Sequence, residues 1–240
     1  MLNIENLDFS YTQNSPVLNN VNINITSGDC VALVGYNGSG KTTIIKLILG
    51  LLKPSQGIVN VFNHSPNINN NDFKSKIGIS FDDPNLIDFL TVNEYLEFVI
   101  NTYKRIENGI TDLHIEEYLE RFKMINYKKT LIRSLSHGTK MKLQLISAMM
   151  SNPELLVLDE PTNSLDFETI LNLEKTIINR NPNQTVFITS HDFDFLESVC
   201  NKFYFLYNKQ VFLLNFDSNN ISIKKEILSI VEDNISEGRS

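Results

Sequence analysis

Short apolar runs rich in Val and Ile alternate with segments of helical periodicity along most of the chain. The runs predict strands at Leu2–Phe9, Val21–Ile25, Cys30–Val34, Ile58–Phe62, Ile77–Phe81, Leu155–Leu158, Val186–Thr189 and Phe203–Tyr207. Leu155–Leu158 is apolar at every position, which is typical of a central strand covered on both faces. Strands that alternate with helices predict an α/β fold with a mostly parallel sheet.

The middle of the chain has a different pattern, because strand signals disappear between about Asp83 and Met150. Helices are predicted there at Val92–Tyr103, Asp112–Phe122 and Thr139–Met150. We therefore predict one domain over 1–240, with an α/β core (1–82 and 151–216), an inserted helical lobe (83–150) and a C-terminal tail (217–240). The tail contains a predicted amphipathic helix at Ile221–Val231, and the Asn-rich segment Pro66–Asp72 is predicted to be a loop.

Composition narrows the function classes. The formal net charge is −7 and the pI is near 5.1, which argues against a protein that coats nucleic acid with a basic surface. Cys30 and Cys200 lie far apart in the sequence with no CxxC or His partner nearby, so neither a disulfide framework nor a zinc site is expected.

No membrane span is expected from this sequence, since no uninterrupted apolar stretch reaches the roughly 18 residues that a span requires. The N-terminus starts with a strand-like alternation and not with a secretory signal pattern. If a membrane is involved, another chain must cross it.

A phosphate-binding loop is predicted at Gly35–Thr42, where the sequence matches GxxxxGK[ST] between the strand Cys30–Val34 and the helix Thr42–Leu49. The loop glycines let successive N–H groups face a phosphate, and the helix adds its positive end. Lys41 is expected at the β- and γ-phosphates, and Thr42 at Mg²⁺. The candidate nucleotide contacts are Gly35, Tyr36, Asn37, Gly38, Ser39, Gly40, Lys41, Thr42 and Thr43. The alternative is a Gly-rich turn before an ordinary helix.

Two carboxylates, Asp159 and Glu160, follow the predicted central strand directly. They are expected at the carboxyl edge of the sheet, where open α/β sheets bind ligands. Asp159 would then hold Mg²⁺, and Glu160 would orient and polarise the water that attacks the γ-phosphate. Solvated charges at a strand end are the alternative.

The remaining motifs appear in a fixed order: Leu135-Ser136-His137-Gly138-Thr139-Lys140, then Asn163-Ser164-Leu165-Asp166, then Thr189-Ser190-His191-Asp192. With the P-loop and the acidic pair, this ordered set resembles the ATP-binding subunits of ABC transporters, from Tyr11 to about His191. The expected fold is then a P-loop NTPase core that also has an N-terminal antiparallel β portion.

The resemblance assigns roles to single residues. Ser136 and Gly138 fit the signature segment that contacts the partner subunit's ATP, and Ser136 can cap a helix that begins near Thr139. His191 fits the switch histidine at the γ-phosphate, and Asp166 fits the loop that communicates across a dimer. Tyr11 fits the aromatic residue that stacks on adenine, with a structural strand-end Tyr as the alternative.

Three positions depart from the family pattern. His137 and Thr139 stand where the signature has Gly and Gln. The segment around Asp82 takes the place of the Q-loop but contains no Gln, so Asp82, with Asp83 as the alternative, is the expected Mg²⁺ contact there. Slower hydrolysis is one expected consequence.

The resemblance implies an ATPase with the cofactors ATP and Mg²⁺, which energises transport from the cytoplasmic face of the cell membrane. Its implied partners are a separate integral membrane permease and a second ATP-binding subunit, and a homodimer is favoured over a heterodimer. Leu90-Thr91-Val92 resembles the helix start of ABC-2 type exporters, which favours export. The alternatives are a soluble ABC ATPase that acts on nucleic acid or ribosomes, and a regulatory nucleotide-binding module with weak hydrolysis.

Overall fold

A computed structural model describes residues 1–12, 15–104, 112–215 and 223–237. The chain forms two compact units. The first unit consists of Met1–Asn67 and Thr189–Ser240, and the second consists of Ile68–Ile188.

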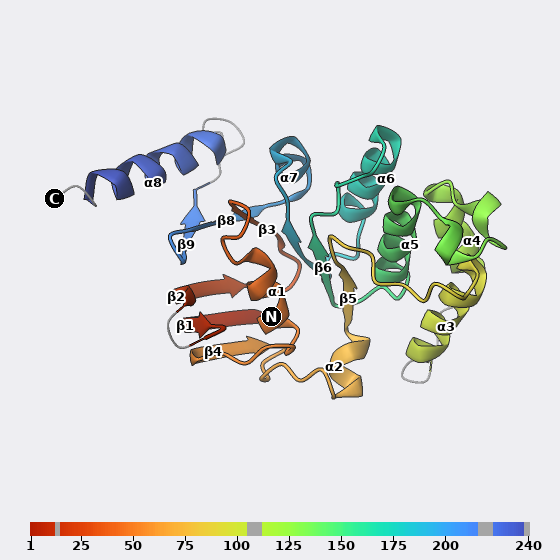
Figure 1. The fold of residues 1–240 in the computed structure, drawn as a ribbon, viewed down its shortest axis with the longest axis horizontal. Helices are drawn as coiled ribbons and strands as arrows, with labels where there is room; N and C mark the ends of the chain where they lie inside the picture. Colours follow the sequence, from red (N-terminus) through yellow and green to blue (C-terminus); the bar gives the residue numbers. More distant parts are fainter. Residues whose placement is uncertain (13–14, 105–111, 216–222, 238–240) are drawn as a thin grey trace. The chain divides into compact units, whose positions relative to one another are not determined.

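An antiparallel sheet opens the first unit, with the strand order β2-β1-β4 (Figure 1). Its strands are β1 (Leu2–Ser10), β2 (Pro16–Ile25) and β4 (Gln56–Val61). Leu2 pairs with Ile25 and Ile4 with Ile23, so the apolar positions of neighbouring strands share one buried face. The predicted N-terminal antiparallel β portion is therefore confirmed.

The P-loop of the first unit is carried by β3 (Cys30–Gly35) and α1 (Lys41–Ile48). All six residues of β3 are buried, and its neighbour in the ladder is the parallel strand β8 (Lys202–Tyr207). A tight hairpin at Asn208 and Lys209, both with positive φ, returns the chain to the antiparallel strand β9 (Gln210–Leu214). The unit also contains α7 (Phe193–Val199) and α8 (Ile223–Glu237).

The second unit contains the strand order β5-β6-β7 and most of the helices (Figure 1). Its strands are β5 (Ile77–Ser80), β6 (Leu155–Asp159) and β7 (Thr185–Thr189). Its helices are α2 (Asn71–Ser75), α3 (Val92–Lys104), α4 (Asp112–Arg121), α5 (His137–Met149) and α6 (Phe167–Ile178), with short 3₁₀ turns at Ile125–Tyr127 and Ile132–Ser134. β5 and β6 run parallel, and all five residues of β6 are buried, as predicted for a central strand.

The expected fold class is confirmed by the parallel pairing in each unit and by the antiparallel sheet. Between positions 83 and 150, the described residues form helices and turns but no strand. The division into core, lobe and tail stays a prediction. Among the described stretches, no helix has both the length and the hydrophobicity needed to cross a membrane.

Several element predictions were wrong in position or missing. The segment predicted to be a loop at Pro66–Asp72 contains the start of α2, because Asn70 caps that helix by accepting from the backbone N–H groups of Asp72 and Phe73. β2 begins five residues before the predicted Val21, because Asn19 and Asn20 hide its alternation. The helices α6 and α7 and the strand β9 were not predicted. Ile221, the predicted start of the last helix, lies outside the described residues.

Candidate functional site

The P-loop of the first unit requires glycine at three positions. Gly38 and Gly40 have φ of 77° and 115°, a region that disfavours side chains. At Gly35, a Cβ atom would lie 2.8 Å from both the Leu206 carbonyl oxygen and the Ser39 Oγ atom. The loop backbone therefore passes close to β8 and then turns directly into α1.

Lys41 lies inside this loop and is only 7% exposed. Its Nζ atom donates to the Gly35 carbonyl oxygen at 2.8 Å and lies 3.2 Å from His191 Nε2. His191 Nε2 is also 2.7 Å from Asn37 Oδ1. Lys41 and His191 are 150 positions apart in sequence, so the fold brings the predicted switch histidine to the predicted P-loop.

His191 is placed by the elements that flank it. It lies two residues after the end of β7, and the next residue, Asp192, caps α7 by accepting from the Phe195 backbone N–H at 3.1 Å. The imidazole therefore lies on a short connection between a buried strand and a capped helix.

Tyr11 contacts the beginning of α1. Its hydroxyl lies 3.1 Å from Thr43 Oγ1, and its ring meets Phe9 edge-on with a centroid distance of 4.9 Å. The ring is 57% exposed. These contacts place Tyr11 beside the P-loop helix, and its predicted adenine contact stays a prediction.

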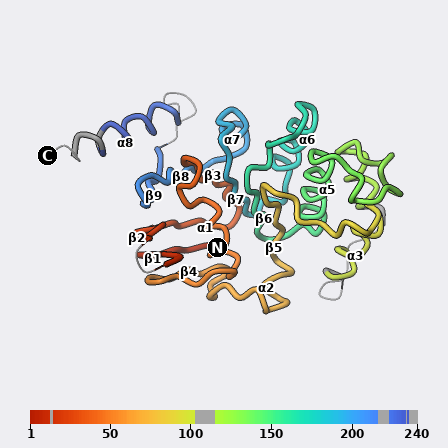
Figure 2. The backbone as a smooth tube through the Cα atoms, in the orientation of Figure 1, coloured from red at the N-terminus to blue at the C-terminus, as the bar shows by residue number. Residues whose placement is uncertain are grey.

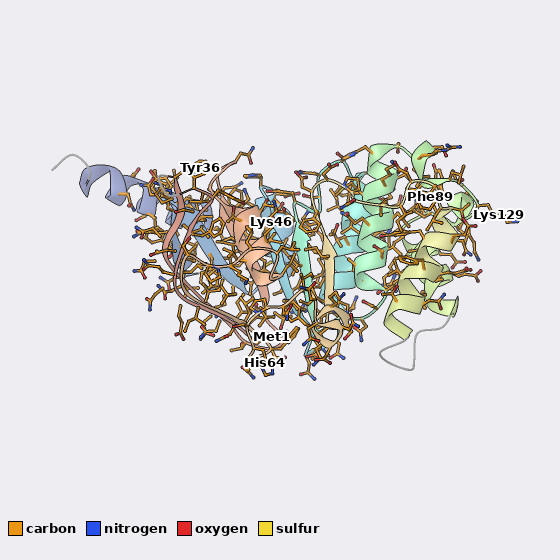
Figure 3. All side chains as sticks on the ribbon, turned by 60° about the horizontal axis from the view of Figure 1, so that its bottom comes forward. Met1, Tyr36, Lys46, His64, Phe89 and Lys129 are labelled. Carbon is orange, nitrogen blue, oxygen red and sulfur yellow. The ribbon has the colours of Figure 1, made fainter. Side chains whose placement is uncertain are left out.

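A cavity of about 300 Å³ lies in the first unit beside the P-loop. Tyr36, His191 and Phe205 line it together with Lys224 and Ile227 from α8. Figure 3 shows the labelled Tyr36 close to that helix. Sequence analysis placed Tyr36 in the P-loop but gave no sign that the C-terminal helix approaches it.

The acidic pair ends β6 in the second unit. Asp159 is 3% exposed and Glu160 is 7% exposed. Glu160 has a φ of 49°, an unusual backbone conformation for a residue with a side chain. The tight turn continues with a hydrogen bond from the Asn163 N–H to the Glu160 carbonyl oxygen at 3.2 Å.

The predicted signature segment forms the beginning of α5. Ser136 is the N-cap, and its hydroxyl accepts from the Thr139 N–H at 3.3 Å. The predicted cap is confirmed, although the helix begins at His137 and not near Thr139. A Cβ atom at Gly138 would lie 2.5 Å from the Ser164 carbonyl oxygen, so the turn after Glu160 packs directly on the signature segment.

Asp166 connects the same turn to α5. It caps α6 through the Thr169 N–H at 2.9 Å and pairs with Lys142 Nζ at 2.6 Å. The hydrogen bond from Lys142 is the main cause that lowers the pKa of Asp166, and the bond from the Thr169 N–H adds to it.

Asp82 lies on the loop after β5, where its Oδ1 accepts from Asn163 Nδ2 at 2.8 Å. Asp82 is exposed and contacts the turn that follows the acidic pair. Its predicted role as a metal ligand stays a prediction, as do the assigned roles of the other site residues.

Gln144 is a positioning residue that sequence analysis missed. It is 4% exposed on α5, and its side chain bonds to Ser80 Oγ at 3.1 Å, to the Phe81 carbonyl oxygen at 2.7 Å and to the Asn85 N–H at 3.0 Å. It therefore holds the loop that carries Asp82, and Figure 2 shows that loop running past α5. The sequence feature that could have indicated this role is the single amide side chain among the mostly apolar residues of Met141–Met150.

Each unit thus contains part of the predicted site. The first contains Tyr11, the P-loop from Gly35 to Thr43, and His191, and the second contains Asp82, Ser136, Gly138, Asp159 and Glu160. The sequence model of the ABC transporter family matches residues 18–163.

The chain belongs to the ABC transporter family.

Curated relatives of this ABC ATPase domain include both large and small proteins. Over 193 residues it is 32% identical to mouse (Mus musculus) glucosylceramide transporter ABCA12, covering 80% of this chain but only 7% of that protein. It is 32% identical to the lantibiotic transport ATP-binding protein SrtF of Streptococcus pyogenes, covering 89% of this chain and 90% of SrtF. It is 33% identical to the ATP-binding protein Uup of Buchnera aphidicola subsp. Acyrthosiphon pisum, covering 99% of this chain and 37% of Uup.

A solved ATP-binding subunit of an ABC transporter has the same fold, with a TM-score of 0.86 and 24% identity over 96% of this chain and 99% of that one. ABC domains of this type bind and hydrolyse ATP, and this chain is an ATPase domain of that family.

Proposed function

We propose that this ABC ATPase hydrolyses ATP within a pair of ATP-binding subunits and drives export through a separate membrane permease. The observation that carries the proposal is the contact of His191 with Lys41 and Asn37 of the P-loop. The contact places an imidazole beside the lysine expected at the β- and γ-phosphates, where a positioned donor can stabilise the charge that develops on the γ-phosphate.

The P-loop fits a nucleotide triphosphate. Ser39 Oγ is buried without a hydrogen-bond partner among the described atoms, and the N–H groups at the start of α1 form a positive helix end. In the proposed function, Gly35 to Thr43 cradle the phosphates, and Lys41 exchanges its bond to the loop carbonyl for the phosphate oxygens. Tyr11 faces adenine.

Hydrolysis depends on Glu160 and His191 in this proposal. Glu160 accepts a hydrogen bond from the attacking water and orients it, and His191 donates to the γ-phosphate oxygen from its place beside Lys41. Ser136 and Gly138 contact the triphosphate bound by the second subunit, because they lie at the N-terminus of α5, whose helix dipole favours an anion.

In the proposed function, Thr42 of the first unit and Asp159 of the second unit are Mg²⁺ ligands, because both side chains offer the oxygen atoms that Mg²⁺ prefers. The Thr42 hydroxyl lies in the first turn of α1, and the Asp159 carboxylate is held in a buried position at the end of β6. Mg²⁺ prefers one or two such ligands together with phosphates and water. Asp82 is the third proposed ligand, and the bound ion would neutralise charge on the phosphates.

Export is supported by the similarity to SrtF, whose name describes lantibiotic transport and whose length this chain nearly matches. We propose that the permease contacts the loop after β5, where Phe89 is 78% exposed (Figure 3). The protein would then be peripheral on the cytoplasmic face of the cell membrane.

The catalytic proposal is tested by Glu160→Gln with Glu154→Gln as the matched control. The two residues flank β6, but Glu154 is a surface residue whose side chain is 58% exposed. We expect ATP turnover to fall about 100-fold or more in E160Q, because its amide cannot act as a base, and to stay unchanged in E154Q. Equal rates in wild type and E160Q would contradict the proposed role.

The partner proposal is tested by membrane fractionation with and without the co-encoded permease. We expect the protein in the membrane pellet only when the permease is present, and a pull-down of the complex should recover two copies of this chain. The similarity to Uup, whose name describes an ATP-binding protein and does not mention transport, leads to a second candidate function, a soluble ABC ATPase that acts on nucleic acid or ribosomes. A distribution that does not respond to the permease would favour that candidate.

A further inference from the structure

The two cysteines of the chain, far apart in sequence, meet in the first unit. Cys30 Sγ and Cys200 Sγ are 3.6 Å apart although 170 positions separate them. Neither cysteine is in a disulfide, and both are buried, with exposures of 1% and 7%. The expectation from sequence spacing, that no disulfide is indicated, did not anticipate this contact.

Two hydrogen bonds join the backbone at Cys30 to Asn201, the residue after Cys200. The Asn201 N–H donates to the Cys30 carbonyl oxygen at 2.9 Å, and the Cys30 N–H donates to Asn201 Oδ1 at 2.9 Å. The next residues, Val31 and Lys202, are partners in the parallel ladder of β3 and β8. The two sulfur atoms therefore approach across adjacent segments that the sheet already aligns.

We propose that Cys30 and Cys200 form a redox-active thiol pair that a hydroperoxide converts into a reversible intrachain disulfide. A disulfide needs an Sγ–Sγ distance of about 2.05 Å, so the sulfur atoms must approach by about 1.5 Å from their present 3.6 Å.

The reaction balances with hydrogen peroxide as the oxidant. The Cys200 thiol first loses its proton to solvent. The thiolate then attacks one peroxide oxygen, the O–O bond breaks, and the leaving hydroxide takes up a proton from solvent to give a sulfenic acid and one water. Cys30 then attacks the Cys200 sulfur, the S–S bond forms, the S–O bond breaks, and a second water leaves. Cys200 reacts first because it is the more exposed of the two, and peroxide is small enough to reach it.

The bond would join the start of β3 to the end of α7. β3 leads into the P-loop that holds Lys41, and α7 begins just after His191. The disulfide would therefore fix the N-terminal end of β3 and the C-terminal end of α7, the ends of these two elements that lie away from Lys41 and His191 in the sequence. It also closes a long loop, which restricts the unfolded chain and raises the unfolding temperature by roughly 10 °C.

The test is a peptide map of the wild-type protein after hydrogen peroxide treatment, with free thiols alkylated under denaturing conditions. We expect neither cysteine to be alkylated, a linked peptide pair that contains Cys30 and Cys200, and full recovery of both thiols with dithiothreitol. The chain has only two cysteines, so an intrachain disulfide has one possible assignment. Methionine oxidation is not reversed by dithiothreitol and does not interfere.

The proposal is overturned if both thiols are still alkylated at peroxide levels that oxidise a free cysteine peptide. It is also overturned if the products are only sulfinic or sulfonic acids, or if the disulfide joins two chains. In Cys200→Ala the peroxide-dependent rise in unfolding temperature should be absent, and a rise that dithiothreitol still reverses would contradict the assignment. If that variant does not fold, the wild-type map decides.

Discussion

Gln144→Leu tests whether one buried amide holds the loop that carries Asp82. The variant keeps the approximate side-chain volume but removes the bonds to Ser80, Phe81 and Asn85. Each bond contributes about 1 kcal/mol net, so about 3 kcal/mol is lost. Burying leucine carbons in place of an amide returns about 1 kcal/mol. The expected net loss is about 2 kcal/mol.

Thermal unfolding followed by circular dichroism measures this loss. For a chain of this size, 2 kcal/mol lowers the midpoint by roughly 4–8 °C. Ser80 is fully buried, so its hydroxyl cannot regain a partner from water, whereas Asn85 is exposed and can. We also expect slower ATP turnover with unchanged nucleotide affinity, because the P-loop is not altered.

The matched control is Gln210→Leu, the same chemical change at an exposed position of β9. Its midpoint should stay close to that of wild type, since surface substitutions change stability by about 0.5 kcal/mol or less. A Gln144→Leu midpoint that equals the control would refute the reasoning from the three buried bonds.

Three further predictions test other parts of the protein. His191→Ala should lower ATP turnover about 100-fold, whereas His64→Ala, at an exposed turn, should not; equal rates for the two variants would remove His191 from the mechanism. Gly78→Ala should destabilise the protein by on the order of 3 kcal/mol or more, because the alanine Cβ would lie 2.0 Å from a backbone carbonyl oxygen of α5. A urea unfolding midpoint equal to that of wild type would contradict this close packing of β5 on α5. Asp166→Ala should cost about 1–2 kcal/mol at pH 7, while Asn at this position keeps the cap and should cost less. The pKa of Asp166 is lowered in the folded state, first by the hydrogen bond from Lys142. The charge therefore contributes fully to stability above the unfolded pKa near 3.8, and its contribution is lost as the pH falls through the folded pKa. The difference in unfolding free energy between wild type and the Asn variant should be constant from about pH 5 to 8 and should narrow below about pH 4.

The amino-acid sequence by itself determined the features that are local in the chain. The P-loop follows from glycines, a lysine and a threonine at fixed spacing, because the turn and the helix start are built from consecutive residues. The buried strand β6 and the cap at Ser136 were predicted for the same reason, and both are confirmed. The order of the motifs was sufficient to indicate the family that the comparison then established.

Only the tertiary structure decided which distant residues meet. The contact of His191 with Lys41, the three bonds of Gln144 and the approach of Cys30 to Cys200 all join segments far apart in sequence. Sequence periodicity reports which face of an element is buried, but not what packs against it. Local patterns also failed where polar residues interrupt an element, as Asn19 and Asn20 do in β2. The ladder with β1 shifts register there, and the N–H groups of Asn19 and Asn20 donate to the Lys209 carbonyl oxygen and to Asp8 Oδ1, both distant in sequence.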